Sequence, residues 1–509
     1  MRGPFCLLPS AFCLLTSLLL SACAKTPTGA PGIPAFIPPV FAQAAPAPAL
    51  VPSPVAQLQS EILAATSSPG VRRATWGIVV YSIDRNERLF ELNPHALLVP
   101  ASVAKLASVA SAVDAVGWDH RFETTVRTNG TVDNGTLRGD LFIVGSGDPA
   151  IGGRGGDDIT SWIDALKAAG IRRIEGRIVG DDNAIEEPRP ALAWAWDDLG
   201  YPTGALFGAL NYGENRTVVT VTPGGLAGQP TTVSLDAVSQ GRPLINRTVT
   251  AGRGSASMVW PEQRPGETAL TIAGSVPEGG RPARLAVSAG NPTLWFATVF
   301  RNRLRLAGIE VTGEAADIDD VQVPPAVTPL YSYQSRPLSE IVPPLLKESI
   351  NLYGEAVMRL NAVPGALPTN DAALAGFRTR LAAWGIPGEG QQLIDGSGLS
   401  RRDVITPDAL MTILLRMYDR SDASPWMQAL PIAGVDGSLE NRLKGTPAER
   451  NVRAKTGTMS NIRSLAGYVT AANGEHLAFV VMVNDFEGTG AAALQAIDSI
   501  AVQMAGFRR

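Results

Sequence analysis

Cysteine is nearly absent from this chain of 509 residues, and its few copies are confined to one end. Cys6, Cys13 and Cys23 all lie within the first 23 residues. The rest of the chain therefore has no thiol and forms no intramolecular disulfide, so apolar burial must hold its fold together. A hydrophobic content of 45% over this length is ample for more than one core.

Histidine is equally rare, and the three histidines, His95, His120 and His476, are far apart in the sequence. The chain also lacks a G-x-S-x-G motif. A histidine-based catalytic triad and a two-histidine metal site therefore have little support, and we expect no metal and no cofactor. The formal net charge is only −4 and there is no basic run, so nucleic acid is not an expected partner.

The long apolar run needed to span a membrane is missing as well. Arg2 and the apolar stretch 5–20 precede Leu-Ser-Ala-Cys23, a pattern typical of a secretory signal peptide over residues 1–22. The run is short and contains Pro9, which disfavours a permanent membrane span. Leu-Ser-Ala-Cys resembles the bacterial lipobox, so we expect a periplasmic protein anchored in a membrane by lipid on Cys23. An ordinary signal peptide cut nearby is the alternative.

The residue that follows this cysteine, Ala24, favours the outer membrane, because aspartate there would favour retention in the inner one. Residues 23–54 are rich in proline and alanine and carry no charge beyond Lys25. Such a segment favours extended polyproline geometry at ~3.1 Å per residue. We predict a linker that holds the folded body away from its anchor.

The remaining sequence predicts an α+β fold in which an antiparallel sheet flanked by helices is assembled from both ends of the chain. We predict a catalytic domain from residues 55–121 and 325–509, an insert domain from 122–215 and 290–324, and a β-rich inner insert at 216–289. Helices are expected at 55–65, 101–116, 158–169, 291–306, 339–347, 352–360, 370–384, 406–417 and 490–504. Asn291-Pro292 and Thr406-Pro407 predict helix starts, and breaks are expected around Pro343-Pro344 and at the 349–351 junction. Strands are expected at 75–83, 89–92, 122–128, 136–144, 174–179, 217–222, 231–235, 257–260, 269–273, 284–287, 463–470 and 476–484. Asn473-Gly474 predicts that the last two pair as a hairpin.

Three short motifs carry the chemistry: Ser102-Val-Ala-Lys105, Ser349-Ile-Asn351 and Lys455-Thr-Gly457. An S-x-x-K, an S-x-N and a K-T-G in this order form the residue set of serine enzymes that use lysine to activate the nucleophile. The chain has only six lysines, so a lysine in each outer motif is unlikely to be chance.

Residues i and i+3 share a helix face, so Lys105 is expected to reach the Ser102 hydroxyl from a helix that begins at Ser102. Lysine acts as a base only when burial or a nearby cation lowers its pKa, and Lys455 is a candidate for that cation. An S-x-x-K pair is by itself more often a solvated helix pair. The apolar residues that flank this one argue against a solvated face.

The other two motifs are ordinary in isolation, since serine and asparagine often cap helices and K-T-G often starts a strand. In a site, the Ser349 hydroxyl relays a proton and the Asn351 amide holds the substrate backbone. Gly457 would let substrate lie against the strand edge, and lysine and threonine groups would bind a carboxylate.

The chain resembles the D-alanyl-D-alanine carboxypeptidase/endopeptidase family of low-molecular-mass penicillin-binding proteins, the type with a large insert between the first two motifs. The similarity spans roughly 55–505 and includes, beyond the three motifs, the stretches 100–105, 144–149, 395–401, 434–438 and 454–458. Ile350 stands where this family commonly has aspartate, and Val103 where a small polar residue is frequent. Neither position should carry proton chemistry.

The resemblance implies a penicillin-binding, serine β-lactamase-like fold and a Ser102 acyl-enzyme, with Lys105 as base. Ser349 and Lys455 would carry a proton to the departing amine, and backbone N–H groups of Ser102 and Thr458 would form the oxyanion hole.

The partners implied are peptidoglycan stem peptides and β-lactam antibiotics, which would acylate the same serine. Thr456 and Thr458 would hold the substrate carboxylate. Asp148 would either meet an amino group of the stem peptide or form an ordinary Asp-Pro turn, and the turn is favoured. Removal of a terminal D-alanine and cleavage of cross-links use one site, so their balance stays open, as does the oligomeric state. A β-lactamase and a non-catalytic wall-binding lipoprotein are the alternatives.

Overall fold

The computed structural model describes residues 53–509 apart from 155–157, 237, 240–241, 265, 323–327, 364 and 366. The predicted signal peptide, Cys23 and nearly all of the linker lie outside the described residues. Residues from Pro52 to Arg509 form one compact unit. Within the described part of the chain, no helix has the length and apolarity required to span a bilayer.

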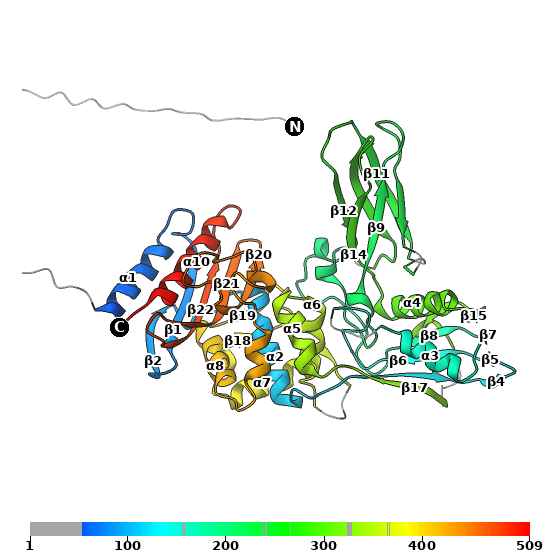
Figure 1. Ribbon diagram of the computed structural model, residues 1–509, viewed down its shortest axis with the longest axis horizontal. Coiled ribbons are helices and arrows are strands. Elements are labelled where there is room, and N and C mark those ends of the chain that lie inside the picture. Colours follow the sequence, from blue (N-terminus) through cyan, green and yellow to red (C-terminus); the bar gives the residue numbers. More distant parts are fainter. Residues whose placement is uncertain are drawn as a thin grey trace, which may run out of the picture. The chain divides into compact units, whose positions relative to one another are not determined.

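The central sheet has five antiparallel strands and draws them from both ends of the sequence (Figure 1). Their order is β2 (Glu87–Leu92), β1 (Thr75–Ser82), β22 (His476–Asn484), β21 (Ile462–Thr470) and β20 (Arg453–Met459). The Asn473-Gly474 turn joins β21 and β22 as the sequence predicted. The strand β20 carries Lys455 and forms the edge of the sheet.

Both faces of this sheet are buried, and the side chains of β22 alternate between them. Phe479, Val481 and Val483 pack with α1 (Pro54–Thr66) and α10 (Ala491–Gly506), which lie side by side in Figure 1. Val480 and Met482 pack on the opposite face in a second core. The helices that contribute to this second core are α2 (Ala104–Val116), α5 (Leu338–Lys347), α6 (Asn351–Arg359), α7 (Asn370–Ala383), α8 (Pro407–Tyr418) and α9 (Ser424–Ala429).

Two expectations about these helices were wrong. The α-helix α2 begins at Ala104 rather than at Ser102, because the 3-10 turn η1 (Ala101–Val103) precedes it. Pro343 and Pro344 lie inside α5 and do not break it. Each proline removes a backbone hydrogen bond, but the same helix buries five apolar side chains, which offsets that loss.

The insert between the first two motifs contains two further mixed sheets. One has the order β16 (Ala315–Asp317), β8 (Ile178–Asp181), β6 (Leu141–Val144), β3 (Glu123–Thr128) and β17 (Thr328–Gln334). The other has the order β15 (Glu310–Val311), β7 (Arg173–Ile174), β5 (Thr136–Arg138) and β4 (Thr131–Asp133). Helices α3 (Thr160–Ala168) and α4 (Pro292–Leu306) bury Trp162, Phe296 and Phe300 with them. Asn291 caps α4 as predicted.

The strands predicted at 136–144 and 174–179 are each split in two, and the halves belong to different sheets. The breaks fall near Gly139 and Gly176, where the two chain segments touch. A Cβ on Gly176 would lie 2.1 Å from the carbonyl oxygen of Gly139. This crossing of two backbones requires glycine, and a pattern of apolar residues does not reveal it.

The β-rich inner part consists of two three-stranded sheets around a small apolar core. Their orders are β10 (Thr232–Leu235), β9 (Arg216–Thr222), β14 (Ala283–Ser288), and β11 (Leu244–Ala251), β13 (Leu270–Pro277), β12 (Met258–Glu262). Sequence analysis missed β11, which buries only Thr248 and Thr250. The boundaries proposed for the three domains stay predictions.

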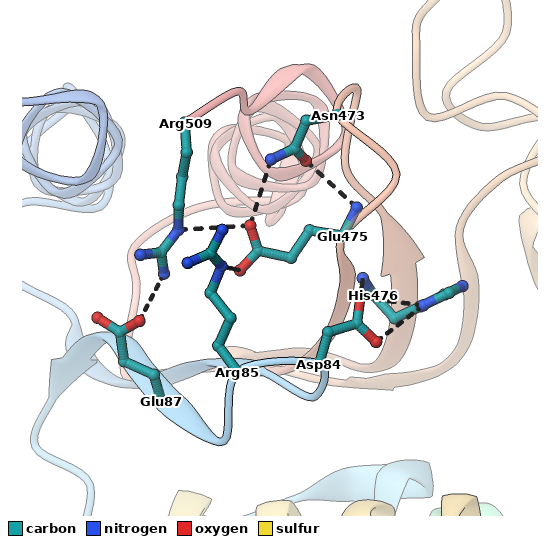
Figure 2. Close-up of polar contacts among 7 residues, drawn as sticks. All are labelled: Asp84, Arg85, Glu87, Asn473, Glu475, His476 and Arg509. Atoms are coloured by element: carbon teal, nitrogen blue, oxygen red, sulfur yellow. Dashed lines mark hydrogen bonds and ion pairs between the residues drawn. The ribbon is translucent and has the colours of Figure 1, made fainter.

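A polar cluster on the central sheet fastens the C-terminus of the chain to its first hairpin (Figure 2). The Glu475 carboxylate lies 3.7 Å from Arg85 and 3.4 Å from Arg509. Arg509 also donates to Glu87 over 2.7 Å. Because the Glu475 side chain is almost fully buried, the two arginines offset the cost of burying its negative charge. The cluster helps to join the two distant parts of the sequence in one sheet.

Candidate active site

The segment that carries Ser102 is clamped to the ends of β22 and β21. The Asn484 side chain accepts from the Val99 N–H over 2.8 Å and donates to the Val99 carbonyl over 3.1 Å. The Ser464 hydroxyl donates to the Pro100 carbonyl over 2.9 Å. Ala101 then adopts a left-handed backbone conformation with φ of 49°. A strained residue directly before the serine shows that its position is fixed by the surrounding structure.

Lys105 joins the first two motifs. Its Nζ donates to Ser102 Oγ over 2.8 Å, to Asn351 Oδ1 over 2.7 Å and to the Ser397 carbonyl over 2.6 Å. The Lys105 side chain is completely buried. The interpretation of this pair as a solvated helix pair is therefore excluded. Three acceptors around one ammonium nitrogen hold it next to the serine hydroxyl.

Burial lowers the pKa of Lys105 from 10.5 to about 7, because the charged form is disfavoured away from water. Three carboxylates, Asp395, Glu355 and Asp403, act in the opposite direction and favour the ammonium. A pKa near 7 lets the amine accept a proton and return it at neutral pH.

Lys455 and Ser349 form the other end of the site. Lys455 Nζ donates to Ser349 Oγ over 2.9 Å and to the Thr456 carbonyl over 2.8 Å. Ser349 has a φ of 61°, a left-handed conformation that is uncommon for any residue except glycine. The S-x-N motif thus lies in a sharp junction between α5 and α6, with Asn351 as the first residue of α6.

Burial and the positive charge of Lys105 both lower the pKa of Lys455 well below its usual value. We had expected Lys455 to be the cation that lowers the pKa of Lys105. The pKa of Lys105 is lowered by burial. The repulsion between the two ammonium groups lowers the pKa of Lys455.

A cavity of about 500 Å³ opens over these groups. Five of the predicted residues line it: Ser102, Ser349, Asn351, Thr456 and Thr458. Two buried lysines, Lys105 and Lys455, lie behind its wall. The arrangement offers a hydroxyl and an amine on each side of one space.

Gly457 packs closely against the segment that leads to Ser102, and its predicted contact with substrate stays a prediction. A Cβ on this residue would lie 2.5 Å from the Pro100 carbonyl oxygen. The glycine therefore lets β20 pack against the segment that leads to Ser102, and it is not among the residues that line the cavity. Its neighbours Thr456 and Thr458 line the cavity, as the alternation of side chains along a strand requires. Thr456 Oγ1 also donates to Ser438 Oγ over 2.7 Å.

Asp148 is not brought into the site. Its side chain is 1% exposed, and Oδ1 accepts from the Ala150 N–H over 2.9 Å, the geometry of a local aspartate turn. It is absent from the cavity lining. The alternative of an ordinary Asp-Pro turn fits the structure, and the suggested contact with a stem-peptide amine does not.

Sequence analysis missed one wall of the cavity, which comes from the insert. Residues in the stretch 193–203 contribute Ala193, Ala195, Asp197, Asp198 and Thr203. The Asn351 side chain donates to the Thr203 carbonyl over 2.9 Å, which ties this wall to the second motif. The lining also includes Arg401, from the stretch 395–401 to which no role had been given. The sequence signal for this wall was the Asp197-Asp198 pair close to three aromatic residues, Trp194, Trp196 and Tyr201.

The described residues contain no group of three or more histidine, cysteine, aspartate or glutamate side chains suited to hold a metal ion.

The family model for D-Ala-D-Ala carboxypeptidase 3 (S13) matches residues 58–506. The chain belongs to this family. The match spans the serine and lysine motifs and the whole insert between them. It confirms the family and the enzyme class predicted from the motifs: a serine D,D-peptidase.

Individual relatives agree. The chain is 32% identical to a D-alanyl-D-alanine carboxypeptidase of Actinomadura sp. (strain R39), over 89% of this chain and 85% of the relative. It is 27% identical to the D-alanyl-D-alanine carboxypeptidase DacB of Haemophilus influenzae, over 81% and 85%.

The crystal structure of penicillin-binding protein 4 from Haemophilus influenzae superposes with a TM-score of 0.75 and 25% identity, over 88% of this chain and 98% of that one. The penicillin-binding fold with its insert is thereby confirmed.

Proposed function

We propose that this peptidase forms an acyl-enzyme on Ser102 with the carbonyl carbon of a penultimate D-alanine. The observation that carries the proposal is the buried Lys105 amine, 2.8 Å from the Ser102 hydroxyl. With a pKa of about 7, the neutral amine accepts the hydroxyl proton as the C–O bond forms. Backbone N–H groups of Ser102 and Thr458 would bind the developing oxyanion, where losing one donor typically costs about 10²–10³-fold in rate.

The departing group of this reaction is an amine, which must receive a proton. We assign that transfer to Ser349, whose hydroxyl lies 2.9 Å from Lys455 Nζ and lines the same cavity. As the C–N bond breaks, the Ser349 proton passes to nitrogen, and Ser349 regains a proton from the Lys105 ammonium, which had taken it from Ser102. Lys455 holds the Ser349 oxygen during this transfer, and Lys105 is neutral again at its end. Water then attacks the ester carbonyl and neutral Lys105 takes its proton. Lys105 returns that proton to Ser102 Oγ as the ester C–O bond breaks, which restores the serine hydroxyl and the neutral amine.

The substrate we propose is a peptidoglycan stem peptide that ends in D-alanyl-D-alanine, or a cross-link between two stems. Thr456 and Thr458 line the cavity where a terminal carboxylate would bind. Asp197, Asp198 and Arg401 all line the cavity, so it holds charges of both signs. A stem peptide that carries both an ammonium and a carboxylate is complementary to it.

β-Lactams are proposed as ligands of the same serine. A structure of the Haemophilus influenzae penicillin-binding protein 4 in complex with a novel β-lactam superposes on this chain with a TM-score of 0.70 and 25% identity. A β-lactam carbonyl attacked by Ser102 would give a slowly hydrolysed ester, which is how the antibiotic would trap the enzyme.

We also propose that the protein works in the periplasm, attached by a lipid on Cys23 to the outer membrane. The support is the leader sequence and the charge-poor linker that follows it. Mass spectrometry of the purified protein would show a diacylated N-terminal cysteine. A free N-terminus at another residue would overturn the anchor while leaving the peptidase proposal intact.

The experiment that tests the catalytic proposal compares the protein with its Ser102→Ala variant on cross-linked muropeptides, followed by mass. We expect loss of D-alanine, of cross-links or of both, and none with the variant. The ratio of the two products gives the balance between carboxypeptidase and endopeptidase activity. If the variant were as active as the parent protein, Ser102 would not be the nucleophile.

A further inference from the structure

The stretch 395–400 passes directly behind the Lys105 amine. Its Ser397 carbonyl accepts the shortest of the three Lys105 hydrogen bonds, 2.6 Å long. The position of that carbonyl therefore helps to fix the direction of the amine toward Ser102. The two-stranded ladder of β18 (Gln391–Gln392) and β19 (Val404–Ile405) closes the base of this loop.

Asp395 organises the loop from within. Its Oδ1 accepts from the backbone N–H groups of Ser397 at 3.0 Å and Gly398 at 2.6 Å, and its Oδ2 accepts from the Ser400 N–H at 2.7 Å. The carboxylate is completely buried. Three backbone donors on one carboxylate give the loop a single conformation around the Ser397 carbonyl.

The Ser397 hydroxyl also donates to Asp395 Oδ1, over 3.3 Å, and a further donor comes from the insert. Trp194 Nε1 donates to Asp395 Oδ2 over 2.7 Å, across 201 positions of sequence. The carbonyl of Leu192, two residues before Trp194, accepts from the Ser400 hydroxyl over 2.7 Å. These contacts join the insert to the loop that holds the catalytic amine.

Glu355 supports the loop from the other side. It lies one helical turn beyond Asn351 on α6, so the two side chains share a helix face. Its carboxylate accepts from the Ser397 N–H over 2.9 Å and from the Gly396 N–H over 3.1 Å. The helix thus contacts Lys105 directly through Asn351 and indirectly through the loop.

Two glycines allow this loop to fit between α6 and the nucleophile segment. A Cβ on Gly398, whose φ is 77°, would lie 2.1 Å from the Ala101 carbonyl oxygen. A Cβ on Gly396 would lie 2.2 Å from the Gly354 carbonyl oxygen. The loop therefore has no room to shift without moving Ser102 or α6.

We propose that Asp395 is a positioning residue for Lys105 and that Trp194 completes its hydrogen bonds, so that the insert is a working part of the catalytic centre. This inference rests on the proposed role of Lys105 as the base. The insert would act through the Trp194 N–H, in addition to lining the cavity.

The charges around Lys105 support the same arrangement. The groups that face it are the carboxylates of Asp395, Glu355 and Asp403, with Asp395 having the largest effect on its pKa among them. On the other side lies the Lys455 amine. Because the carboxylates hold the pKa of Lys105 up against burial, removal of the Asp395 charge should lower it further.

The test uses Trp194→Phe and Asp395→Asn in the full protein, with the rate of Ser102 acylation by a fluorescent penicillin and the turnover of a short D-Ala-D-Ala peptide as readouts. Trp194→Phe should slow acylation about 10-fold and lower kcat more than it raises KM, as expected for the loss of one hydrogen bond to a charged acceptor. Asp395→Asn should slow it about 10- to 100-fold and move the acidic limb of the rate profile to lower pH.

The matched control is Trp196→Phe, two residues away and 58% exposed, which should acylate at the parent rate. Trp194→Phe at the parent rate would overturn the role of the insert. A slower Asp395→Asn with an unmoved acidic limb would reduce Asp395 to a structural residue and overturn its link to Lys105. Failure of the proposed function would look different, because the parent protein itself would then not be acylated at Ser102.

Discussion

The two ends of the catalytic cavity place the same kind of residue in different electrostatic surroundings. Lys105 and Lys455 are both completely buried, and each donates to a serine hydroxyl at almost the same distance, 2.8 and 2.9 Å. Burial lowers the pKa of both. The difference is the charge behind them, since carboxylates oppose burial at Lys105 while the neighbouring ammonium reinforces it at Lys455.

This difference shows that burial alone does not assign a catalytic role. At Lys105 the opposing effects leave a pKa of about 7, which suits an amine that gains and loses a proton during turnover. At Lys455 both effects favour the neutral amine, which suits a fixed hydrogen-bond partner of Ser349. Four measurements test this difference between the two ends of the site.

The largest effect is expected for Lys105→Met, which keeps the volume and removes the base. Acylation of Ser102 by a fluorescent penicillin should fall about 10³- to 10⁴-fold, because a serine hydroxyl without a base is a weak nucleophile. Lys444→Met, at an exposed lysine, is the control and should leave the rate unchanged. A loss smaller than about tenfold in Lys105→Met would remove the distinction between the two lysines.

A smaller loss is expected at the other end. Ser349→Ala should lower kcat for peptide about 10²-fold, because the departing amine then lacks its proton donor. Steady-state release of D-alanine measures this. The comparison would be reversed if Ser349→Ala were more damaging than Lys105→Met.

The pH dependence tests the electrostatic difference itself. Below its pKa Lys105 is protonated and cannot accept the Ser102 proton, so kcat/KM should rise about tenfold per pH unit up to about pH 7 and level off above. The profile is measured from pH 5.5 to 9. Ser349→Ala should keep this limb in place, because a serine hydroxyl does not titrate there. A flat profile between pH 6 and 8 would contradict the assignment of Lys105.

The smallest effect is expected at Ile350, where the family commonly has aspartate. This side chain packs against the core and is not among the residues that line the cavity. Ile350→Asp should therefore change kcat less than about threefold and lower stability by about 1 kcal/mol through lost apolar burial. Steady-state kinetics and thermal unfolding measure the two effects. A tenfold gain in kcat would show that position 350 takes part in the chemistry.

Much of the fold followed from local patterns. The Thr406 and Asn291 caps, the Asn473-Gly474 hairpin and the closing helix were all predicted, because caps and tight turns depend on neighbouring residues. The split strands near Gly139 and Gly176 were missed, because the cause is a contact with a distant segment. The predicted break at Pro343 and Pro344 failed for the same reason. The apolar side chains that α5 buries against distant segments offset the backbone hydrogen bonds that the prolines remove.

The candidate site was likewise predicted in part. The motifs supplied Ser102, Lys105, Ser349, Asn351 and Lys455, and the structure brings all five together. Asp148 is buried in a local turn, Gly457 packs against the Pro100 carbonyl, and neither lines the cavity, because only the three-dimensional neighbours decide which way each residue faces.

By itself the sequence predicted which groups would do the chemistry, because each of the three motifs places its serine, lysine or asparagine at a short, fixed spacing. Only the tertiary structure decided the pKa values of these groups and the contacts that hold them in place. The pKa of Lys105 depends on burial and on Asp395, which lies 290 positions away in the chain. Trp194 reaches that same carboxylate from the insert. Electrostatic interactions act through space, so their partners are set by the fold and not by the order of residues.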